Sequence, residues 1–323
     1  MSIERVKFDP ENASDREAWL RERTNFINAS EMAIVCGEGA WGSRAELYAE
    51  KKGLRASQID NKTLRRGRWG ESSVFDALRE ERPEWTIIRA KLHLRDRDRR
   101  IAATPDGFAS VFDRPGPGIV QAKVISRSIY REKWLDDPSG DILGSATAPA
   151  HYRIQVMTEM MLSGCLWGVL AVLINGEHTW ELALLDIDHD AELERAIEDN
   201  VAAFYRDHLD PGIMPDFEPQ RDERLIKALY PKDNGKMIDL RGDNRVLVCV
   251  EDLVQKKVGM KNLKTEIDTL ETEIQAKLGS NTFGLLADGR CLSWKHHRRK
   301  AHTVKASEYR MLRVLAQAPE IDQ

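Results

Sequence analysis

The stretch from Ile101 to Ser126, IAATPDGFASVFDRPGPGIVQAKVIS, constrains the fold most, because it reads as two β-strands joined by a proline- and glycine-rich turn. Asp106 lies near the end of the first predicted strand, and Gln121 and Lys123 lie two residues apart on the second. Side chains alternate across a strand, so Gln121 and Lys123 share one face. The opposite face receives Val120, Ala122 and Val124. The pattern predicts a hairpin that gathers an acid, an amide and a lysine at one end.

The flanking segments predict a mixed α/β core over residues 1–215. Capping-box spacings at 14–17 and 43–46, and a helical stretch from about 61 to 81, make the N-terminal region mostly helical. The alternation in WTIIRAKLHLRD then predicts one strand before the hairpin, and a later pair of strands is joined at Asn175-Gly176. Between them lies a predicted helix from Pro149 to about Leu162. This order predicts a central mixed sheet with helices on its faces.

Residues 216–323 differ in character and predict a linker with a small accessory module. An amphipathic, coiled-coil-like helix is predicted over about 250–278, because its apolar residues recur at spacings of three and four. Those residues are Met260, Leu263, Ile267, Leu270 and Ile274. A hairpin over about 282–295 and a basic tail with the sequence KHHRRK follow. We expect the helix to serve intramolecular packing or an oligomer contact.

Composition narrows the possible environments. No apolar run approaches the roughly 18 residues that a membrane helix needs, and the first residues lack the apolar segment of a signal peptide. We therefore expect a cytoplasmic protein without a membrane partner. The four cysteines are scattered with no CxxC pair, which argues against a disulfide framework or a zinc knuckle.

The net charge of −4 means that any nucleic-acid binding must depend on local basic patches. Arg65, Arg66 and Arg68, with Trp69 beside them, form such a cluster and could track a phosphate backbone. The alternative interpretation of a charge run of this kind is a solvated helix face.

The hairpin residues suit the cleavage of a phosphodiester. That reaction needs an activated water and stabilisation of charge on the phosphate, which carboxylate-bound Mg²⁺ and a nearby lysine supply. Asp106 fits the role of metal ligand, and Lys123 fits the role of the lysine. Alone, this spacing is unspecific, because a turn aspartate and a solvated lysine produce it as well.

The surrounding motifs make the pattern more specific. The segments WLRERTNFINAS, RWGE, ATPDG, IVQAKV and AHYRIQ follow one another in this order between residues 19 and 155. In this respect the chain resembles the YqaJ-type viral recombinase nucleases, the group of phage lambda exonuclease within the PD-(D/E)xK superfamily. The resemblance covers about residues 15–210 and implies a restriction-endonuclease-like fold.

The resemblance also implies roles for individual residues. Glu71 and Asp106 would hold metal ions, two Mg²⁺ or Mn²⁺ in their place, with the backbone carbonyl of Ala122 as a further ligand. Lys123 would act on the attacking water or the phosphate, and Gln155 would brace the site. For Glu71 and Gln155 the alternative is an ordinary helix-surface side chain.

Two further residues correspond to positions that hold the 5′-phosphate of a DNA end, namely Arg23 and Ser30. The alternative for Ser30 is a helix N-cap, and for Arg23 an ion pair with Glu17 or Glu22.

One position departs from the family pattern. Where the family has an acid two residues before the lysine, this chain has Gln121, whose amide oxygen can bind Mg²⁺ but brings no charge. Three explanations are open. The amide suffices, or Glu159, one turn beyond Gln155 on the same helix face, supplies the carboxylate, or the enzyme is impaired.

These inferences predict a Mg²⁺-dependent exonuclease that resects duplex DNA ends, 5′ to 3′, and leaves single strands for phage-type recombination. The resemblance further implies a single-strand annealing recombinase as partner and a ring-shaped homotrimer. The rival hypotheses are an endonuclease of the same superfamily and a catalytically impaired protein that binds DNA ends.

Overall fold

The computed structural model describes residues 3–8, 12–55, 62–298, 300, 306 and 308–315. The chain divides into two compact units, Met1–Leu229 and Tyr230–Gln323, which are described separately. The helices of the first unit are α1 (Ala13–Glu22), η1 (Arg23–Asn25), α2 (Ala29–Val35), α3 (Arg44–Lys51), α4 (Lys62–Glu81), α5 (Arg127–Lys133), α6 (Ala150–Ser163), α7 (Ala191–Phe204), η2 (Tyr205–Leu209) and α8 (Glu223–Leu229). Its strands are β1 (Ile3–Lys7), β2 (Ile27–Asn28), β3 (Thr86–Arg89), β4 (Leu92–Asp96), β5 (Ile101–Ala103), β6 (Gly107–Ser110), β7 (Pro117–Ser126), β8 (Trp167–Asn175) and β9 (Trp180–Asp188).

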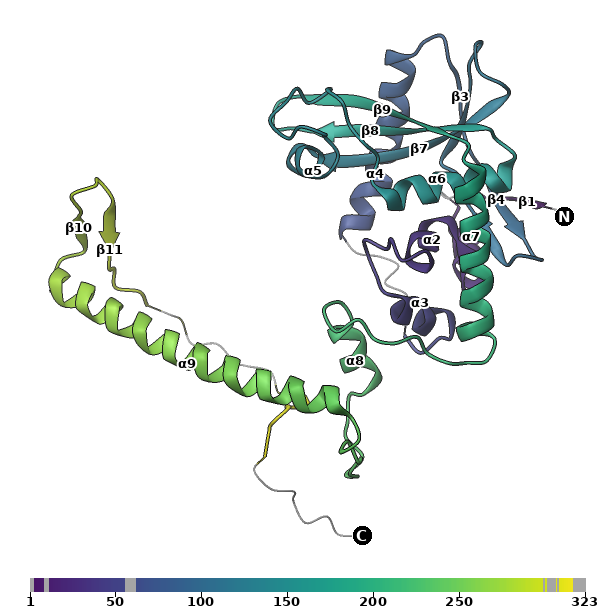
Figure 1. Cartoon of the computed structure of the whole chain (residues 1–323). Helices are drawn as coiled ribbons and strands as arrows, with labels where there is room; N and C mark the ends of the chain where they lie inside the picture. The colour runs from purple at the N-terminus through teal and green to yellow at the C-terminus, as the bar shows by residue number, and fades with distance from the viewer. Residues whose placement is uncertain are drawn as a thin grey trace. The chain divides into compact units, whose positions relative to one another are not determined.

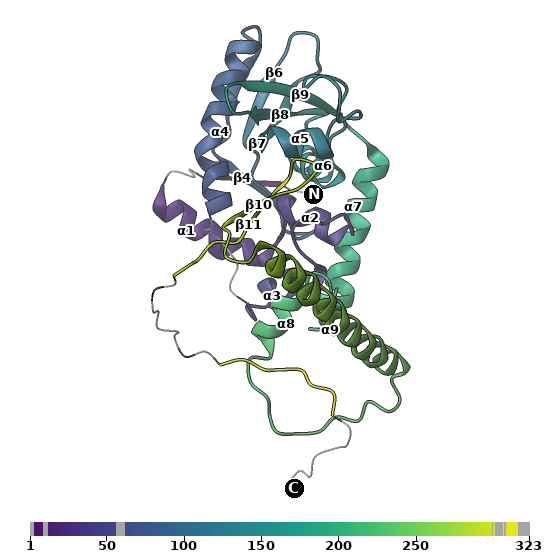
Figure 2. The ribbon, with the colours of Figure 1, turned by 90° about the vertical axis from the view of Figure 1, so that its left-hand side faces the viewer.

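A five-stranded sheet in the order β3-β6-β7-β8-β9 forms the centre of the first unit. β7 and β8 run parallel, whereas each other neighbouring pair is antiparallel. α4 covers one face of this sheet, and α6 and α7 lie on the other (Figures 1 and 2). The predicted α/β class, with a mixed sheet between helices, is confirmed.

The two faces of β7 enter different cores. Val120 and Ala122 pack with apolar residues of α4, whereas Ile119 and Ile125 belong to the core that contains α6. Because side chains alternate along a strand, Gln121 lies on the α6 face together with Lys123. The alternation predicted from the sequence is thus confirmed.

The strands before β7 differ from the prediction, because each predicted strand is split between two sheets. The stretch 86–96 forms β3 in the five-stranded sheet and β4 in a four-stranded sheet of order β1-β4-β5-β2, and β5 and β6 divide in the same way. Pro105 explains one break, since it has no N–H to donate to a ladder. The chain thus crosses from one sheet to the other twice, between β3 and β4 and between β5 and β6. The two crossings are joined by a hydrogen bond that Ala90 N donates to the Asp106 carbonyl at 2.9 Å.

This topology corrects the place of Asp106. It does not lie near the end of the first hairpin strand but in the crossing between β5 and β6, directly before Gly107 opens β6. The crossing holds the carboxyl group at the edge of β7 rather than along a strand.

The first unit extends beyond residue 215, where the sequence suggested a boundary. Ser43 Oγ donates to Asp222 Oδ1 at 2.5 Å, and Leu225 of α8 is buried against Ala45 and Ala49 of α3. These contacts attach α8 to the core, so the segment that follows α7 is not merely an exit linker.

The second unit consists of a long helix, α9 (Asn244–Leu278), and a two-stranded hairpin of β10 (Phe283–Leu285) and β11 (Cys291–Ser293). The helix begins earlier than the predicted residue 250, because the Asp243 side chain caps it by accepting from Arg245 N and Val246 N. Its heptad residues, among them Met260 and Ile267, are exposed. Of the predicted basic tail KHHRRK, only Arg299 lies outside the described residues.

The helices of the described part of the chain include none with the length and apolarity needed to cross a bilayer.

α4 approaches β7 most closely at Gly70, one residue before Glu71. A Cβ built at Gly70 would lie 2.6 Å from Val124 Cγ2 of β7, whereas one built at Gly67 on the same helix would meet nothing within 4 Å. The absence of a side chain at Gly70 therefore lets α4 carry Glu71 next to β7.

We expect Gly70→Ala to lower the free energy of unfolding by about 1–3 kcal/mol, because the stiff valine cannot move aside without a backbone shift. Gly67→Ala is the matched control and should raise it by about 1 kcal/mol through helix propensity alone. Urea unfolding of both variants checks this. Equal effects of the two substitutions would contradict the close packing of α4 on β7.

Candidate active site

Asp106 occupies the open edge of β7. β6 pairs with β7 only as far as Val120, and beyond it the Asp106 Oδ2 atom accepts from Ala122 N at 2.9 Å and from Gln121 Nε2 at 2.5 Å. A strand residue turns its N–H and its C=O to the same edge, so the Ala122 carbonyl shares this edge with Asp106. The structure thus joins three of the predicted site residues.

α6 brings Glu159 and Gln155 to the same place. Gln155 Nε2 donates to Glu159 Oε1 at 3.0 Å, one helical turn apart, and the Glu159 side chain is buried. Burial, and next the neighbouring Asp106, raise the pKa of Glu159 to about 8. Burial also raises the pKa of Asp106 to about 6, against the opposing effect of Lys123. The two carboxyl groups therefore lie within electrostatic reach of one another.

Lys123 supplies the positive charge of the site. It lies two residues after Gln121 on the face of β7 that meets α6, and it is half-buried. Its Nζ atom lies 5.2 Å from the ring centroid of Tyr152, and its charge opposes the raised pKa of both Asp106 and Glu159. The ammonium group thus lies near an aromatic ring, and its charge acts on two acids.

Glu71 approaches from α4, on the other side of the sheet edge. Its Oε1 atom accepts from Arg89 Nη2 at 2.7 Å, and its charge contributes to the raised pKa of Asp106. The sequence prediction missed Arg89, since nothing in the spacing of 18 residues between the two indicates a contact.

A cavity of about 220 Å³ unites these groups with the predicted phosphate-binding residues. Its lining includes Arg23, Ser30, Arg68, Glu71, Asp106, Gln155 and Glu159. Gln121 contacts Asp106 directly without lining the cavity, and Arg65 and Arg66 are exposed farther along α4. Of the predicted arginine cluster, the structure therefore brings only Arg68 to the cavity.

Arg23 is held by a buried ion network that the sequence did not predict. Its Nη2 atom donates to Ser30 Oγ at 3.2 Å and to Glu31 Oε1 at 3.0 Å, so its partner is neither Glu17 nor Glu22. Lys51 Nζ donates to Glu31 Oε2 at 2.6 Å and to the Arg23 carbonyl at 2.8 Å.

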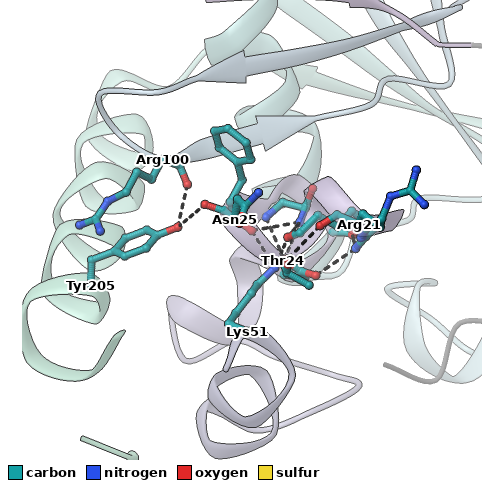
Figure 3. A network of polar contacts seen from close by, with 11 residues as sticks. Arg21, Thr24, Asn25, Lys51, Arg100 and Tyr205 are labelled. Carbon is teal, nitrogen blue, oxygen red and sulfur yellow. Dashed lines mark hydrogen bonds and ion pairs between the residues drawn. The ribbon is translucent and has the colours of Figure 1, made fainter. Parts of the chain in front are cut away.

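Figure 3 shows Lys51 reaching the η1 turn from α3, and Tyr205 donating from η2 to the carbonyls of Arg100 and Asn25. This network fixes the backbone from which Arg23 projects.

Ser30 is not the N-cap of α2. Asn28 caps that helix in a capping box with Glu31, which leaves the hydroxyl of Ser30 exposed beside Arg23. The sequence held this signal, because an asparagine three residues before a glutamate has the capping-box spacing.

A metal ion is implied by the chemistry expected of these residues. Among the described residues, no three Asp, Glu, His or Cys side chains meet closely enough to hold one by themselves. Yet Gln121 Oε1 is buried without a hydrogen-bond partner beside the Asp106 carboxylate, and the Ala122 carbonyl shares that edge. Magnesium takes carboxylate, amide and backbone oxygens, so this donor set fits it.

Comparison with known proteins assigns the region that carries this site. Residues 18–166 match the family model described as "YqaJ-like viral recombinase domain". These residues are similar to that family and are called the YqaJ-like domain. The match spans the segment from α1 to the end of α6, and so includes Arg23, Asp106 and Glu159. The family resemblance predicted from the sequence motifs is confirmed.

Relatives of the YqaJ-like domain include a protein of Bacillus subtilis (strain 168), the uncharacterized protein YqaJ. It is 24% identical over 288 residues, which cover 84% of this chain and 81% of that protein. Among solved structures, an alkaline exonuclease from Laribacter hongkongensis is 20% identical, with 61% of this chain and 94% of that chain covered and a TM-score of 0.46. A phage related exonuclease from Haemophilus somnus 129PT is 15% identical, with 56% and 92% covered and a TM-score of 0.42.

The YqaJ-like domain also carries an aromatic row that the sequence prediction missed. The exposed ring of Trp41 lies edge-on to His151, with 6.1 Å between ring centroids. The His151 ring lies 4.1 Å, again between centroids, from Tyr152, whose ring is the one near Lys123 Nζ. No local signal joins Trp41 to α6, because the contact depends on how the loop before α3 folds back.

The buried network of the YqaJ-like domain gives a pH-dependent prediction. Burial opposes ionisation of Glu31, but Lys51 and Arg23 outweigh it and hold the pKa of Glu31 at about 2, below the ordinary value of 4.5. A lowered carboxyl pKa stabilises the fold above about pH 4.5, and that stabilisation is lost as the pH falls toward 2.

We expect Glu31→Gln to lower the free energy of unfolding by about 3 kcal/mol at pH 7, because it leaves Lys51 buried without its counter-charge. The loss should shrink steadily between pH 4.5 and pH 2. Urea unfolding across this range tests it. The control, Glu17→Gln at an exposed ion pair with Arg21, should change stability by less than about 1 kcal/mol. A loss at Glu31 that does not depend on pH would contradict the prediction.

Proposed function

We propose that this protein is a metal-dependent deoxyribonuclease that degrades duplex DNA from its ends. The observation that carries the proposal is one cavity lined by Asp106, Glu159 and Arg23, with Lys123 on the face of β7 that meets α6. This cavity offers Asp106 and Glu159 as ligands for a cation, and Arg23 and Ser30 as partners for a phosphate. A DNA end presents both a scissile phosphodiester and a terminal phosphate.

The residues that would hold the metal are Asp106, Gln121 and Ala122, the last through its carbonyl oxygen. A bound Mg²⁺ or Mn²⁺ would supply an acidified water and neutralise charge on the phosphate. Lys123 would orient that water or stabilise the phosphate, since its charge acts on both Asp106 and Glu159. A second ion would need Glu71, which would first have to exchange Arg89 for the metal.

Recognition of the DNA end would depend on Arg23. Its guanidinium is held by Glu31 through one nitrogen, and its donors and the exposed Ser30 hydroxyl line the cavity beside each other. Arginine suits this role because its planar fork matches a phosphate. Capture of a 5′-phosphate would place the first phosphodiester of that strand toward Asp106, which favours 5′-to-3′ resection.

Resected ends would leave single strands for phage-type recombination, in keeping with a viral recombinase domain. The single-strand annealing partner and the ring-shaped trimer stay predictions. An endonuclease of the same superfamily is the second candidate, and a DNA-end-binding protein without catalysis is the third. The observation that favours the third is the neutral amide of Gln121 in the position of an acid.

The decisive experiment is digestion of a linear duplex that carries a 5′-phosphate at one end only, with and without Mg²⁺, beside a closed circular duplex. We expect Mg²⁺-dependent loss of the phosphorylated strand alone and an intact circle. Lys123→Ala should lower the rate by about 100-fold or more, whereas Lys227→Ala, at an exposed ion pair on α8, should not. Nicking of the circle would identify an endonuclease. End binding without cleavage in Mg²⁺ or Mn²⁺ would leave only the binding role.

Arg23 gives a separate prediction on the choice of DNA ends. Arg23→Ala should reduce the preference for 5′-phosphorylated over 5′-hydroxyl ends by about tenfold or more, since it removes a charged hydrogen-bond donor. Arg21→Ala is the matched control, because Arg21 is exposed and pairs with Glu17 on the same helix. Rates on the two substrates measure the preference. An unchanged preference in Arg23→Ala would remove Arg23 from end recognition.

A further inference from the structure

Two buried oxygen atoms near Asp106 have no hydrogen-bond partner. They are Gln121 Oε1 on β7 and Glu159 Oε2 on α6, and both side chains are at least 97% buried. A polar atom left unsatisfied in the interior costs free energy, so such atoms are rare and call for an explanation. Two of them beside one carboxylate, on different elements, indicate a place prepared for a ligand.

Each of these side chains uses one polar atom in a hydrogen bond and leaves the other without a partner. Gln121 is tied to Asp106 through its amide nitrogen, which leaves its oxygen unused. Glu159 is tied to Gln155 through Oε1, which leaves Oε2 unused. Each side chain is thus oriented by one atom and presents the other, the arrangement by which outer hydrogen bonds hold metal ligands in place.

The balance of charge identifies the class of ligand. Half-buried Asp106 and buried Glu159 are two carboxyl groups that line one cavity, and Lys123 lies on the face of β7 that meets α6. A divalent cation would neutralise both carboxylates and would satisfy the amide oxygen as well. A neutral or anionic ligand would leave the two acids uncompensated.

We propose that Glu159 supplies the carboxylate that is missing at Gln121, so that a divalent cation is held by Asp106, Gln121 and Glu159. The charge of the site is then the same as if β7 itself carried an acid, but the second carboxylate comes from α6. This rests on the proposed function for its biological meaning, and concerns the identity of a ligand that the family pattern does not assign. Gln155 acts as a positioning residue for Glu159.

The test measures metal binding directly. Mn²⁺ is titrated calorimetrically into the full chain after treatment with EDTA and dialysis, in the absence of DNA. We expect Glu159→Gln to weaken Mn²⁺ binding by about tenfold or more, and Gln121→Glu to strengthen it. The double variant Gln121→Glu with Glu159→Gln should regain the parent affinity, because it moves the carboxylate back to β7. Glu192→Gln, on an exposed position of α7, is the matched control and should bind as the parent does.

Thermal unfolding shows whether the variants fold. Without metal, Glu159→Gln should unfold at the parent's temperature or above, since the amide is nearly isosteric and removes a buried acid. Mn²⁺ should raise the unfolding temperature of the parent and the double variant, and much less that of Glu159→Gln. Loss of the fold in Glu159→Gln would overturn the proposal, because the residue would then be structural.

Digestion of linear duplex in parallel separates the two proposals. If the parent digests DNA and Glu159→Gln binds Mn²⁺ and digests as the parent does, the role of Glu159 is overturned and the nuclease stands. If Mn²⁺ binding follows the carboxylate as expected but the parent cleaves no DNA, the metal site stands and the nuclease falls. If the parent neither binds Mn²⁺ nor cleaves DNA, both are overturned.

Discussion

The site depends on the way Asp106 closes the edge of β7. Where β6 turns away, the carboxylate takes the ladder's place by accepting from Ala122 N and Gln121 Nε2. Withdrawing an acid partly from water is ordinarily costly, and here two N–H groups that need an acceptor offset part of that cost. The same contacts hold the strand on which Lys123 lies. The contacts of Asp106 with β7 thus determine both the geometry and the charge of the site.

The acids around the cavity differ in the kind of partner that each one has. Glu71 and Glu31 are each paired with an arginine or lysine, whereas Asp106 and Glu159 line the cavity together and accept hydrogen bonds from amide groups. The paired acids keep their shape with or without a ligand. If a cation binds as proposed, the two acids that bond to amide groups would change most in free energy.

What the sequence could predict follows from short-range pattern. The alternation along β7 placed Gln121 and Lys123 on one face, and helical spacing placed Glu159 one turn beyond Gln155, as the structure has them. Motif order led to the family. Each of these signals lies within a few residues, where periodicity alone determines direction.

The remaining features depend on contacts distant in sequence. Nothing near Glu71 indicates that Arg89 binds it, and nothing near Arg23 indicates that Lys51 fixes its backbone. The splitting of the strands between two sheets was equally hidden, because alternation continues through the break at Ala90. Two of these features had a visible signal in the sequence. Pro105 marks the second break in the strands, and Asn28 with Glu31 marks the cap of α2, although Ser30 is also a plausible cap residue.

At the crossing that contains Asp106, the backbone serves the fold and the side chain serves the site, so the two can change independently in evolution. The backbone carbonyl of Asp106 joins the two chain crossings through Ala90, whereas only its side chain faces the cavity. An asparagine there would keep the crossing and could still accept from Ala122. If the proposed nuclease activity were lost in a lineage one side chain at a time, the scaffold around this crossing could still pass to its descendants unchanged.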